Sequence, residues 1–253
     1  MSLTWWPRPV RAPPDGFARP LFAGRRRFDT KRESLDLAVL ISGGGRTLIN
    51  LHRQILAGAL PARIRVVVSS RADAAGVGRS REAGLETLVV DRKRLSAEDF
   101  QTQVTEAVRG VDLVCMAGFL SLWRIPVEFT GRVINIHPAL LPKYGGPGMY
   151  GIRVHKAVLA SGDRETGCTV HFCDNVYDHG PIIAQRRVAV FPGETAEMLA
   201  ERVFAEECVA YPEAIRLIAD GRVRCDGPGI ILLPDAAGLT EQSRRDPSGT
   251  SMV

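Results

Sequence analysis

The sequence predicts an α/β protein with a Rossmann-like fold, in which a mostly parallel sheet has helices on both faces. Two observations predict this class: short apolar segments alternate with helical periods, and a glycine-rich turn follows the first apolar segment. The 253 residues, 45% hydrophobic and 24% charged, are enough for one such domain. Because no apolar run approaches the roughly 20 residues of a membrane-spanning helix, we do not expect a membrane protein.

In the first half of the predicted domain, apolar segments typical of strands alternate with segments of helical periodicity. The expected strands are 36–42, 63–70, 87–91 and 112–117. The expected helices are 46–58, 74–83 and 96–109, the last with Ser96 as its N-cap. Strands separated by helices of this length form a parallel sheet, because each crossover returns the chain to the same end.

In the second half of the predicted domain, strands and helices no longer alternate one by one. Strands are expected at 132–137, 167–174 and 182–190, and helices at 150–161 and 195–220. The last two of these strands flank a turn at 178–181, which predicts a C-terminal antiparallel hairpin and a mixed sheet. With a short strand at 222–225, we place one domain at 35–225 and a mostly disordered tail at 226–253.

The formal net charge of +5 is a property of the N-terminal segment. Residues 1–34 contain eight basic and three acidic residues, so the rest of the chain has no net charge. With five prolines and no helical or strand period, this segment is expected to be an Arg/Pro-rich disordered arm. RNA or partner binding through residues 25–27, or a transit peptide, are its functional alternatives. We expect no nucleic-acid binding by the folded body.

The glycine-rich turn is the first candidate site. It reads Ser-Gly-Gly-Gly-Arg-Thr over residues 42–47, between a strand and a helix. Free N–H groups at a helix start favour an anion, especially phosphate, and Arg46 and Thr47 add donors. The turn is not a dinucleotide fingerprint, because the third glycine of that motif is Leu48 here. A purely structural turn is the alternative, and the adjacent arginine favours phosphate.

A second cluster of polar residues lies near the ends of later strands. Asn135 and His137 share one face of their strand, about 6–7 Å apart. An amide donor beside an imidazole can hold a carbonyl oxygen that becomes an oxyanion. Asp178 lies at the hairpin turn, and a carboxylate within reach of His137 would favour the charged imidazolium. A capped strand end and an ordinary turn are the structural alternatives.

A metal site and a disulfide framework are weaker hypotheses for this sequence. His171, Cys173, Asp178 and His179 lie close in sequence, but they lack the usual spacings of metal ligands, so we expect no metal. His52, His155 and His171 are expected to be structural. The five cysteines are an odd number with no Cys-x-x-Cys pair, which favours a reducing compartment, and we expect a cytoplasmic protein.

Several motifs together resemble a known family. They are Ile41-Ser42-Gly43-Gly44-Gly45, Met116-Ala117-Gly118-Phe119, Asn135-Ile136-His137-Pro138 running into Leu140-Leu141-Pro142-Lys143-Tyr144, and Thr169-Val170-His171-Phe172 running into Asp178-His179-Gly180-Pro181. In this order they resemble the folate-dependent formyltransferases. The opening loop is similar to that of the glycinamide ribonucleotide transformylases within that family. The likeness runs from about residue 36 to residue 224.

The resemblance implies a Rossmann-like formyltransferase fold and a reaction. The formyl group would pass from 10-formyltetrahydrofolate, a co-substrate, to the amine of glycinamide ribonucleotide in purine biosynthesis, through a tetrahedral intermediate and without a metal. The resemblance also implies that His137 is the general acid, that Asn135 holds the oxyanion and that Asp178 keeps His137 charged. The implied substrate-binding residues are Gly44, Gly45, Arg46, Thr47 and Glu207; the implied folate-binding residues are Leu120, Ser121, Leu122, Trp123 and Asn135.

The chain departs from the family pattern at three places. Arg46-Thr47 replaces the usual Ser-Asn, and Phe204 stands where some relatives have a phosphate-contacting lysine. The new arginine can compensate for the missing lysine, because a guanidinium binds phosphate bidentately. The run 120–123 also differs from the family. The alternatives are a formyltetrahydrofolate hydrolase, a formyl transfer to another phosphorylated amine, and a non-catalytic phosphate-binding module. Only the enzymes require Asn135, His137 and Asp178 to converge.

Overall fold

The computed structural model describes residues 34–226 and 229–232. The expected arm and most of the expected tail lie outside the described residues. The strands are β1 (Leu35–Ile41), β2 (Ala62–Ser69), β3 (Thr87–Val89), β4 (Leu113–Met116), β5 (Val133–His137), β6 (Glu165–Phe172), β7 (Ile182–Ala189), β8 (Val223–Asp226) and β9 (Gly229–Leu232). The α-helices are α1 (Arg46–Leu56), α2 (Ala75–Glu82), α3 (Ala97–Ala107), α4 (Ile152–Ser161) and α5 (Ala196–Ala219), with a 3₁₀ turn, η1, at Val127–Phe129.

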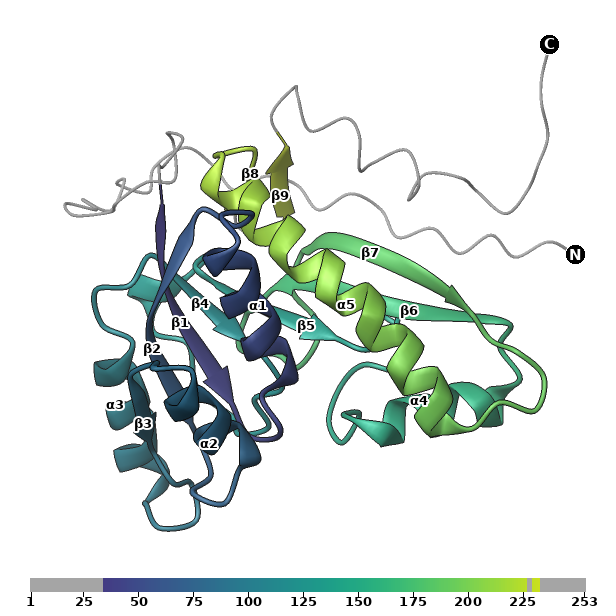
Figure 1. The fold of residues 1–253 in the computed structure, drawn as a ribbon, viewed down its shortest axis with the longest axis horizontal. Coiled ribbons are helices and arrows are strands. Elements are labelled where there is room, and N and C mark those ends of the chain that lie inside the picture. The colour runs from purple at the N-terminus through teal and green to yellow at the C-terminus, as the bar shows by residue number, and fades with distance from the viewer. Residues whose placement is uncertain (1–33, 227–228, 233–253) are drawn as a thin grey trace, which may run out of the picture.

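Seven strands form one mixed sheet in the order β3-β2-β1-β4-β5-β6-β7. The strands from β3 to β5 pair in parallel, and β6 and β7 join them antiparallel as the expected hairpin. Figure 1 shows this hairpin extending the sheet beneath α5. The predicted fold class is therefore confirmed, including the change from parallel to antiparallel pairing.

The strands bury side chains on both faces of the sheet, and two cores result. On β1, Leu37, Val39 and Ile41 belong to one core, while Ala38 and Leu40 belong to the other. Side chains of α1, α4 and α5 complete the first core, and side chains of α3 complete the second. This alternation explains why β1 reads as a continuous apolar run, since a strand buried on both faces has no polar side.

All the elements expected between residues 36 and 225 are present, with bounds that differ by at most two residues. Ser96 caps α3 as predicted, because its Oγ accepts the N–H of Asp99 at 3.0 Å. The unexpected element is β9, which pairs with β8 in a separate two-stranded sheet and lies inside the segment expected to be a tail.

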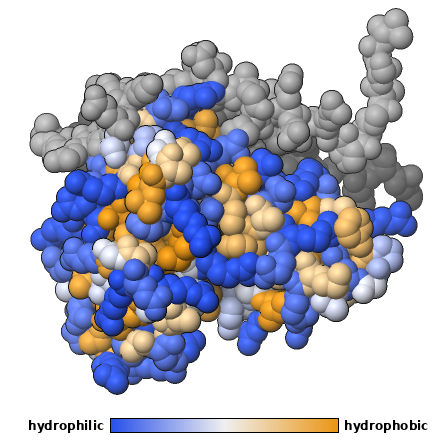
Figure 2. Space-filling model, in the orientation of Figure 1, coloured by the Kyte–Doolittle hydropathy of each residue, from blue (hydrophilic) through white to orange (hydrophobic). Residues whose placement is uncertain are grey.

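The surface has apolar patches separated by hydrophilic residues on the face drawn in Figure 2. Within the part of the chain that the structure describes, no helix is both long enough and apolar enough to cross a membrane.

The carboxyl ends of β1, β4 and β5 meet at one edge of the sheet. The chain passes from β1 outward to β2 and β3, and then returns to β4 on the other side of β1. Such a reversal of strand order opens a crevice in which α/β sheets bind ligands. The fully buried Tyr211 of α5 links β4 and β5, because its hydroxyl oxygen lies 2.9 Å from the carbonyl oxygen of Met116 and 3.2 Å from that of Ile134, and its one hydrogen can be donated to either.

Candidate active site

The glycine-rich loop passes from β1 to α1 in very close contact with α2. Gly45 is the N-cap of α1 with φ of 70°, a left-handed conformation that glycine adopts without strain. A Cβ atom on Gly45 would lie 2.9 Å from the Cα atom of Gly76, and one on Gly76 would lie 2.8 Å from the carbonyl oxygen of Gly43. Both glycines are therefore required for this packing. The N–H groups at the start of α1 have no acceptor within the helix and can bind an anion.

Arg46, the first residue of α1, extends its side chain to α5. Its guanidinium lies 3.8 Å from the ring centroid of Phe204. Its two terminal nitrogens donate to the two carboxylate oxygens of Glu201, at 2.6 and 2.5 Å. The two departures from the family pattern, at 46 and 204, are therefore in contact. Thr47, the next residue of α1, is buried.

Glu207 lies one helical turn after Phe204 on α5. Burial raises the pKa of its carboxyl to about 7, and the Arg46 guanidinium opposes part of this rise. The carboxyl therefore gains and loses a proton near neutral pH. In the protonated form it can donate one hydrogen bond and accept another, which suits a pair of hydroxyl groups.

Asn135 and His137 lie on the same face of β5, as strand alternation predicts. In the antiparallel register with β6, Asn135 is opposite His171 and His137 is opposite Thr169. The imidazole of His137 is 3% exposed. The end of β5 thus holds an amide and an imidazole side by side at the carboxyl edge of the sheet.

Asp178 joins this pair from the loop between β6 and β7. Its Oδ1 atom lies 3.5 Å from His137 Nδ1 and 3.5 Å from Asn135 Nδ2. Its Oδ2 atom accepts the N–H of Gly146 at 2.9 Å. The structure therefore brings together the three residues that the resemblance implied to be catalytic, although they come from two separate segments of the chain.

His137 is held by a main-chain oxygen that motif reading did not reveal. Its Nε2 atom lies 2.8 Å from the carbonyl oxygen of Tyr144. A carbonyl oxygen can only accept, so Nε2 carries the hydrogen of this bond. The proton that His137 can exchange is therefore on Nδ1, the atom that faces Asp178.

His171, which we expected to be structural, orients Asn135. Its Nδ1 atom donates to the carbonyl oxygen of Phe172 at 2.9 Å, which leaves Nε2 as an acceptor. Nε2 lies 3.2 Å from Asn135 Nδ2, and burial lowers the pKa of His171, which favours this neutral form. The amide nitrogen of Asn135 is therefore turned toward the catalytic cluster. The cross-strand register that produces this contact cannot be read from the sequence.

Two residues of the site have unusual backbone conformations. Tyr144 has φ of 57° and Asp178 has φ of 51°, and among the described residues they are the two non-glycine residues with positive φ. Such conformations cost free energy and persist where the surrounding structure imposes them, often at active sites. The carbonyl oxygen of Tyr144 and the carboxylate of Asp178 both lie against His137, so the backbone strain coincides with this cluster.

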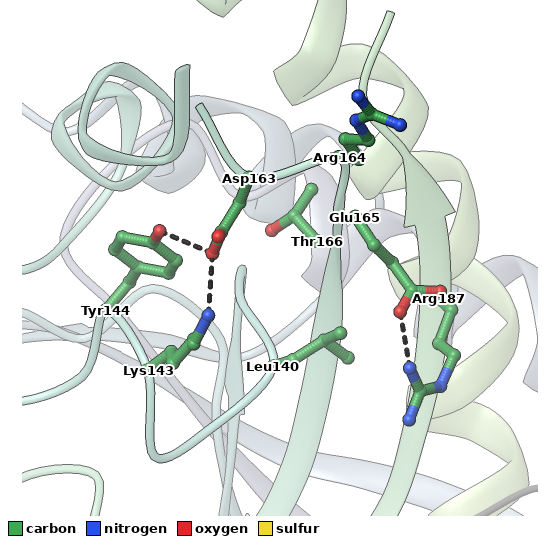
Figure 3. Close-up of a pocket in the computed structure, with 8 residues that line it drawn as sticks. All are labelled: Leu140, Lys143, Tyr144, Asp163, Arg164, Glu165, Thr166 and Arg187. Atoms are coloured by element: carbon green, nitrogen blue, oxygen red, sulfur yellow. Dashed lines mark hydrogen bonds and ion pairs between the residues drawn. The ribbon is translucent and has the colours of Figure 1, made fainter. Parts of the chain in front are cut away.

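The loop that carries Tyr144 is anchored beside a cavity of about 340 Å³. Figure 3 shows the Tyr144 hydroxyl and the Lys143 ammonium converging on Asp163. The hydroxyl donates to Asp163 Oδ2 at 2.7 Å, and Lys143 Nζ lies at 3.0 Å from the same oxygen. These two donors lower the pKa of Asp163. None of the three proposed catalytic residues lines this cavity. Its lining residues instead anchor the loop of Tyr144, whose carbonyl oxygen positions His137.

The four residues expected to contact folate, 120–123, differ in their exposure to solvent. Leu120 and Leu122 are exposed, and Ser121 is half-buried. The N–H of Leu120 donates to Ser42 Oγ at 2.8 Å, which joins this segment to the glycine-rich loop. Trp123 is 2% exposed and belongs to the second core. Its side chain packs in this core, so we expect only the backbone of this residue to line a folate site.

The residues weighed as metal ligands are separated in the structure. His179 is exposed and pairs with Asp174, with Nδ1 at 2.7 Å from Oδ2, while His171 is buried beside Asn135. Among residues 34–226 and 229–232, no three His, Cys, Asp or Glu side chains are grouped to hold a metal. A metal-free site stays a prediction.

Fold and site together define a class of protein, and sequence comparison agrees with it. The formyl transferase family profile matches residues 35–215, and the chain belongs to this family. It is 40% identical over 205 residues to the chloroplastic phosphoribosylglycinamide formyltransferase of Arabidopsis thaliana, covering 78% of this chain and 70% of that one. It is 34% identical to the Haemophilus influenzae phosphoribosylglycinamide formyltransferase, covering 74% of this chain and 89% of the relative.

A solved structure gives the same result. The chain is similar to glycinamide ribonucleotide transformylase 1 from Symbiobacterium toebii, with a TM-score of 0.74 and 41% identity. The match covers 79% of this chain and 95% of that one.

Proposed function

We propose that this protein transfers the formyl group of 10-formyltetrahydrofolate to the amine of glycinamide ribonucleotide, a step in purine biosynthesis. The convergence of Asn135 and His137 on Asp178 Oδ1 carries this proposal. The glycine-rich loop at the same edge of the sheet supports a phosphorylated substrate. The family membership and the names of the relatives support the reaction and its acceptor.

The catalytic residues act on a tetrahedral intermediate. The substrate amine attacks the formyl carbon, so a C–N bond forms and the carbonyl oxygen becomes an oxyanion. Asn135 Nδ2 and the Nδ1–H of protonated His137 donate hydrogen bonds to that oxygen. The bond from carbon to N10 of the folate then breaks, N10 receives a proton from His137, and the attacking nitrogen loses one. Asp178 stabilises the imidazolium and relays the proton released by the amine.

The substrates are placed at neighbouring positions along the carboxyl edge of the sheet. The phosphate of glycinamide ribonucleotide binds the N–H groups of Gly44 and Gly45 and the side chains of Arg46 and Thr47. The carboxyl of Glu207 binds the ribose hydroxyls. The folate lies beside Asn135 along residues 120–123, with Trp123 contributing backbone only, and along the loop 173–178.

Cysteine chemistry supports our proposal for the compartment. The five cysteines, all within the described residues, form no disulfide, and Cys115 and Cys168 are buried. Thiols persist where the surroundings are reducing, which supports our placement of the protein in the cytoplasm.

The experiment is formyl transfer to glycinamide ribonucleotide by the parent chain and by the H137N variant. We expect kcat to fall by about two to four orders of magnitude in H137N, the range over which a general acid contributes. H179N is the matched control, because His179 adjoins Asp178 but is exposed and pairs with Asp174. An inactive parent that releases formate from the folate would instead indicate a hydrolase. Equal activity in H137N and the parent would refute the assignment of the general acid.

A further inference from the structure

The contacts of Arg46 differ in kind. Phe204 contacts the face of the guanidinium, at 3.8 Å from the ring centroid, whereas Glu201 binds its edge through two hydrogen bonds. A guanidinium recognises phosphate through the same edge that binds a carboxylate. Glu201 therefore occupies the donors that a phosphate would use, while Phe204 leaves them accessible.

The pair of Arg46 and Glu201 is exposed to solvent. The side chain of Arg46 is 47% exposed and that of Glu201 is 63% exposed. Exposed ion pairs contribute little to stability, since water and salt screen them and two flexible side chains must be ordered. A phosphate dianion has twice the charge of a carboxylate and a third oxygen that can bind the N–H groups at the start of α1. The phosphate therefore has the stronger interactions at this position.

On the face of α5 that meets α1, three residues recur at helical spacing. Glu201, Phe204 and Glu207 lie at intervals of three residues, so they line one side of the helix. Glu207 is close enough to Arg46 for the guanidinium to lower its pKa. The guanidinium thus lies between a carboxylate at the outer end and a buried carboxyl at the inner end, with the ring of Phe204 between them.

We propose that Glu201 is a displaceable counter-ion of Arg46 that a substrate phosphate monoester replaces, and that Phe204 is a positioning residue that keeps the guanidinium in place during the exchange. This inference rests on the proposed function, because it assigns the phosphate to the glycine-rich loop. In the ligand-free protein Glu201 satisfies Arg46 and opposes phosphate binding. On binding, the Glu201 carboxylate moves into solvent and the phosphate takes both guanidinium donors.

Two variants test opposite sides of this exchange. Removing the charge of Glu201 in E201Q removes the competitor, so the KM for glycinamide ribonucleotide should fall two- to fivefold with kcat unchanged within twofold. Removing the aromatic ring in F204L leaves the guanidinium unsupported, so KM should rise at least threefold with kcat similarly unchanged. F204Y, which keeps an aromatic ring, should restore the parent KM.

Binding of ribose 5-phosphate, measured by titration calorimetry on the full chain, separates this exchange from the reaction. E201Q should tighten binding two- to fivefold, and the change should disappear in the R46A background. E197Q is the matched control, because Glu197 is an acidic residue one turn earlier on the same helix and its substitution changes the net charge equally.

Three outcomes would overturn the inference: weaker or unchanged binding in E201Q, an equal gain in E197Q, or a gain that persists without Arg46. Tighter binding in E201Q by a chain that transfers no formyl group would uphold the exchange and refute the proposed reaction. Formyl transfer with binding that E201Q leaves unchanged would do the reverse.

Discussion

The raised pKa of Glu207 predicts a pH-dependent change in stability that one substitution should remove. The carboxyl is held on α5 against the sheet, and burial raises its pKa from 4.5 to about 7. The folded protein therefore binds this proton more tightly than the unfolded chain does. Between pH 4.5 and pH 7 the folded state retains more protons than the unfolded state, so the free energy of unfolding falls as the pH rises.

The size of the effect follows from this pKa difference. At 1.36 kcal/mol for each pH unit, a change from 4.5 to about 7 corresponds to about 3 kcal/mol over the full range and about 2.5 kcal/mol between pH 5 and pH 8. The side chain retains some exposure, so these values are upper limits. In E207Q the neutral amide replaces the carboxyl and this contribution disappears.

The assay is urea unfolding of the parent and E207Q at pH 5, 6, 7 and 8. We expect E207Q to gain stability relative to the parent as the pH rises, by up to about 2.5 kcal/mol at pH 8 compared with pH 5. The matched variant E197Q changes an exposed carboxylate on the same helix, and its difference from the parent should stay constant. A constant difference for E207Q as well would refute the reasoning, because it would mean that folding leaves this carboxyl as easy to ionise as in the unfolded chain.

Two further substitutions test the packing that supports the site. Y211F removes a buried hydroxyl that is hydrogen-bonded to carbonyl oxygens of β4 and β5. The free energy of unfolding, measured in urea, should fall by about 1–3 kcal/mol. A loss below about 0.5 kcal/mol would contradict this role of the hydroxyl. G76A places a Cβ atom 2.8 Å from the Gly43 carbonyl oxygen, so it should displace the glycine-rich loop and raise the KM for glycinamide ribonucleotide at least threefold. G78A, in the same helix with open space around its Cβ position, should leave KM unchanged and stabilise the protein by about 0.5–1 kcal/mol; equal KM values in the two variants would argue against the loop contact.

The strands and helices could be predicted because their signals are local. The parallel strands β1, β2, β4 and β5 contribute side chains to both cores, so such a strand appears in the sequence as a short apolar run, as β1 does. The hairpin of β6 and β7 was recognisable from its turn residues. The exception is β9, which pairs only with β8 in a small separate sheet and has no extended alternating pattern.

The candidate site was less predictable, because its contacts depend on register. The motifs identified Asn135, His137 and Asp178, and the structure brings these three together. They did not identify the carbonyl oxygen of Tyr144 or the imidazole of His171 as the groups that orient the site. A main-chain oxygen has no sequence signature, and a histidine on a buried strand is recognised as functional only when its cross-strand neighbour is known.

Sequence by itself determined the order of the secondary structure, the two-faced burial of the sheet and the residue types of the catalytic cluster, because periodicity and motifs are properties of neighbouring residues. Tertiary structure decided which side chains meet. Arg46 and Glu201 are 155 positions apart, and their contact depends on how α5 packs against α1. Tertiary packing likewise places the side chain of Trp123 in the second core rather than at a ligand site. Such outcomes depend on helix orientation and strand register, which arise from the packing of the whole domain and leave no local pattern in the chain.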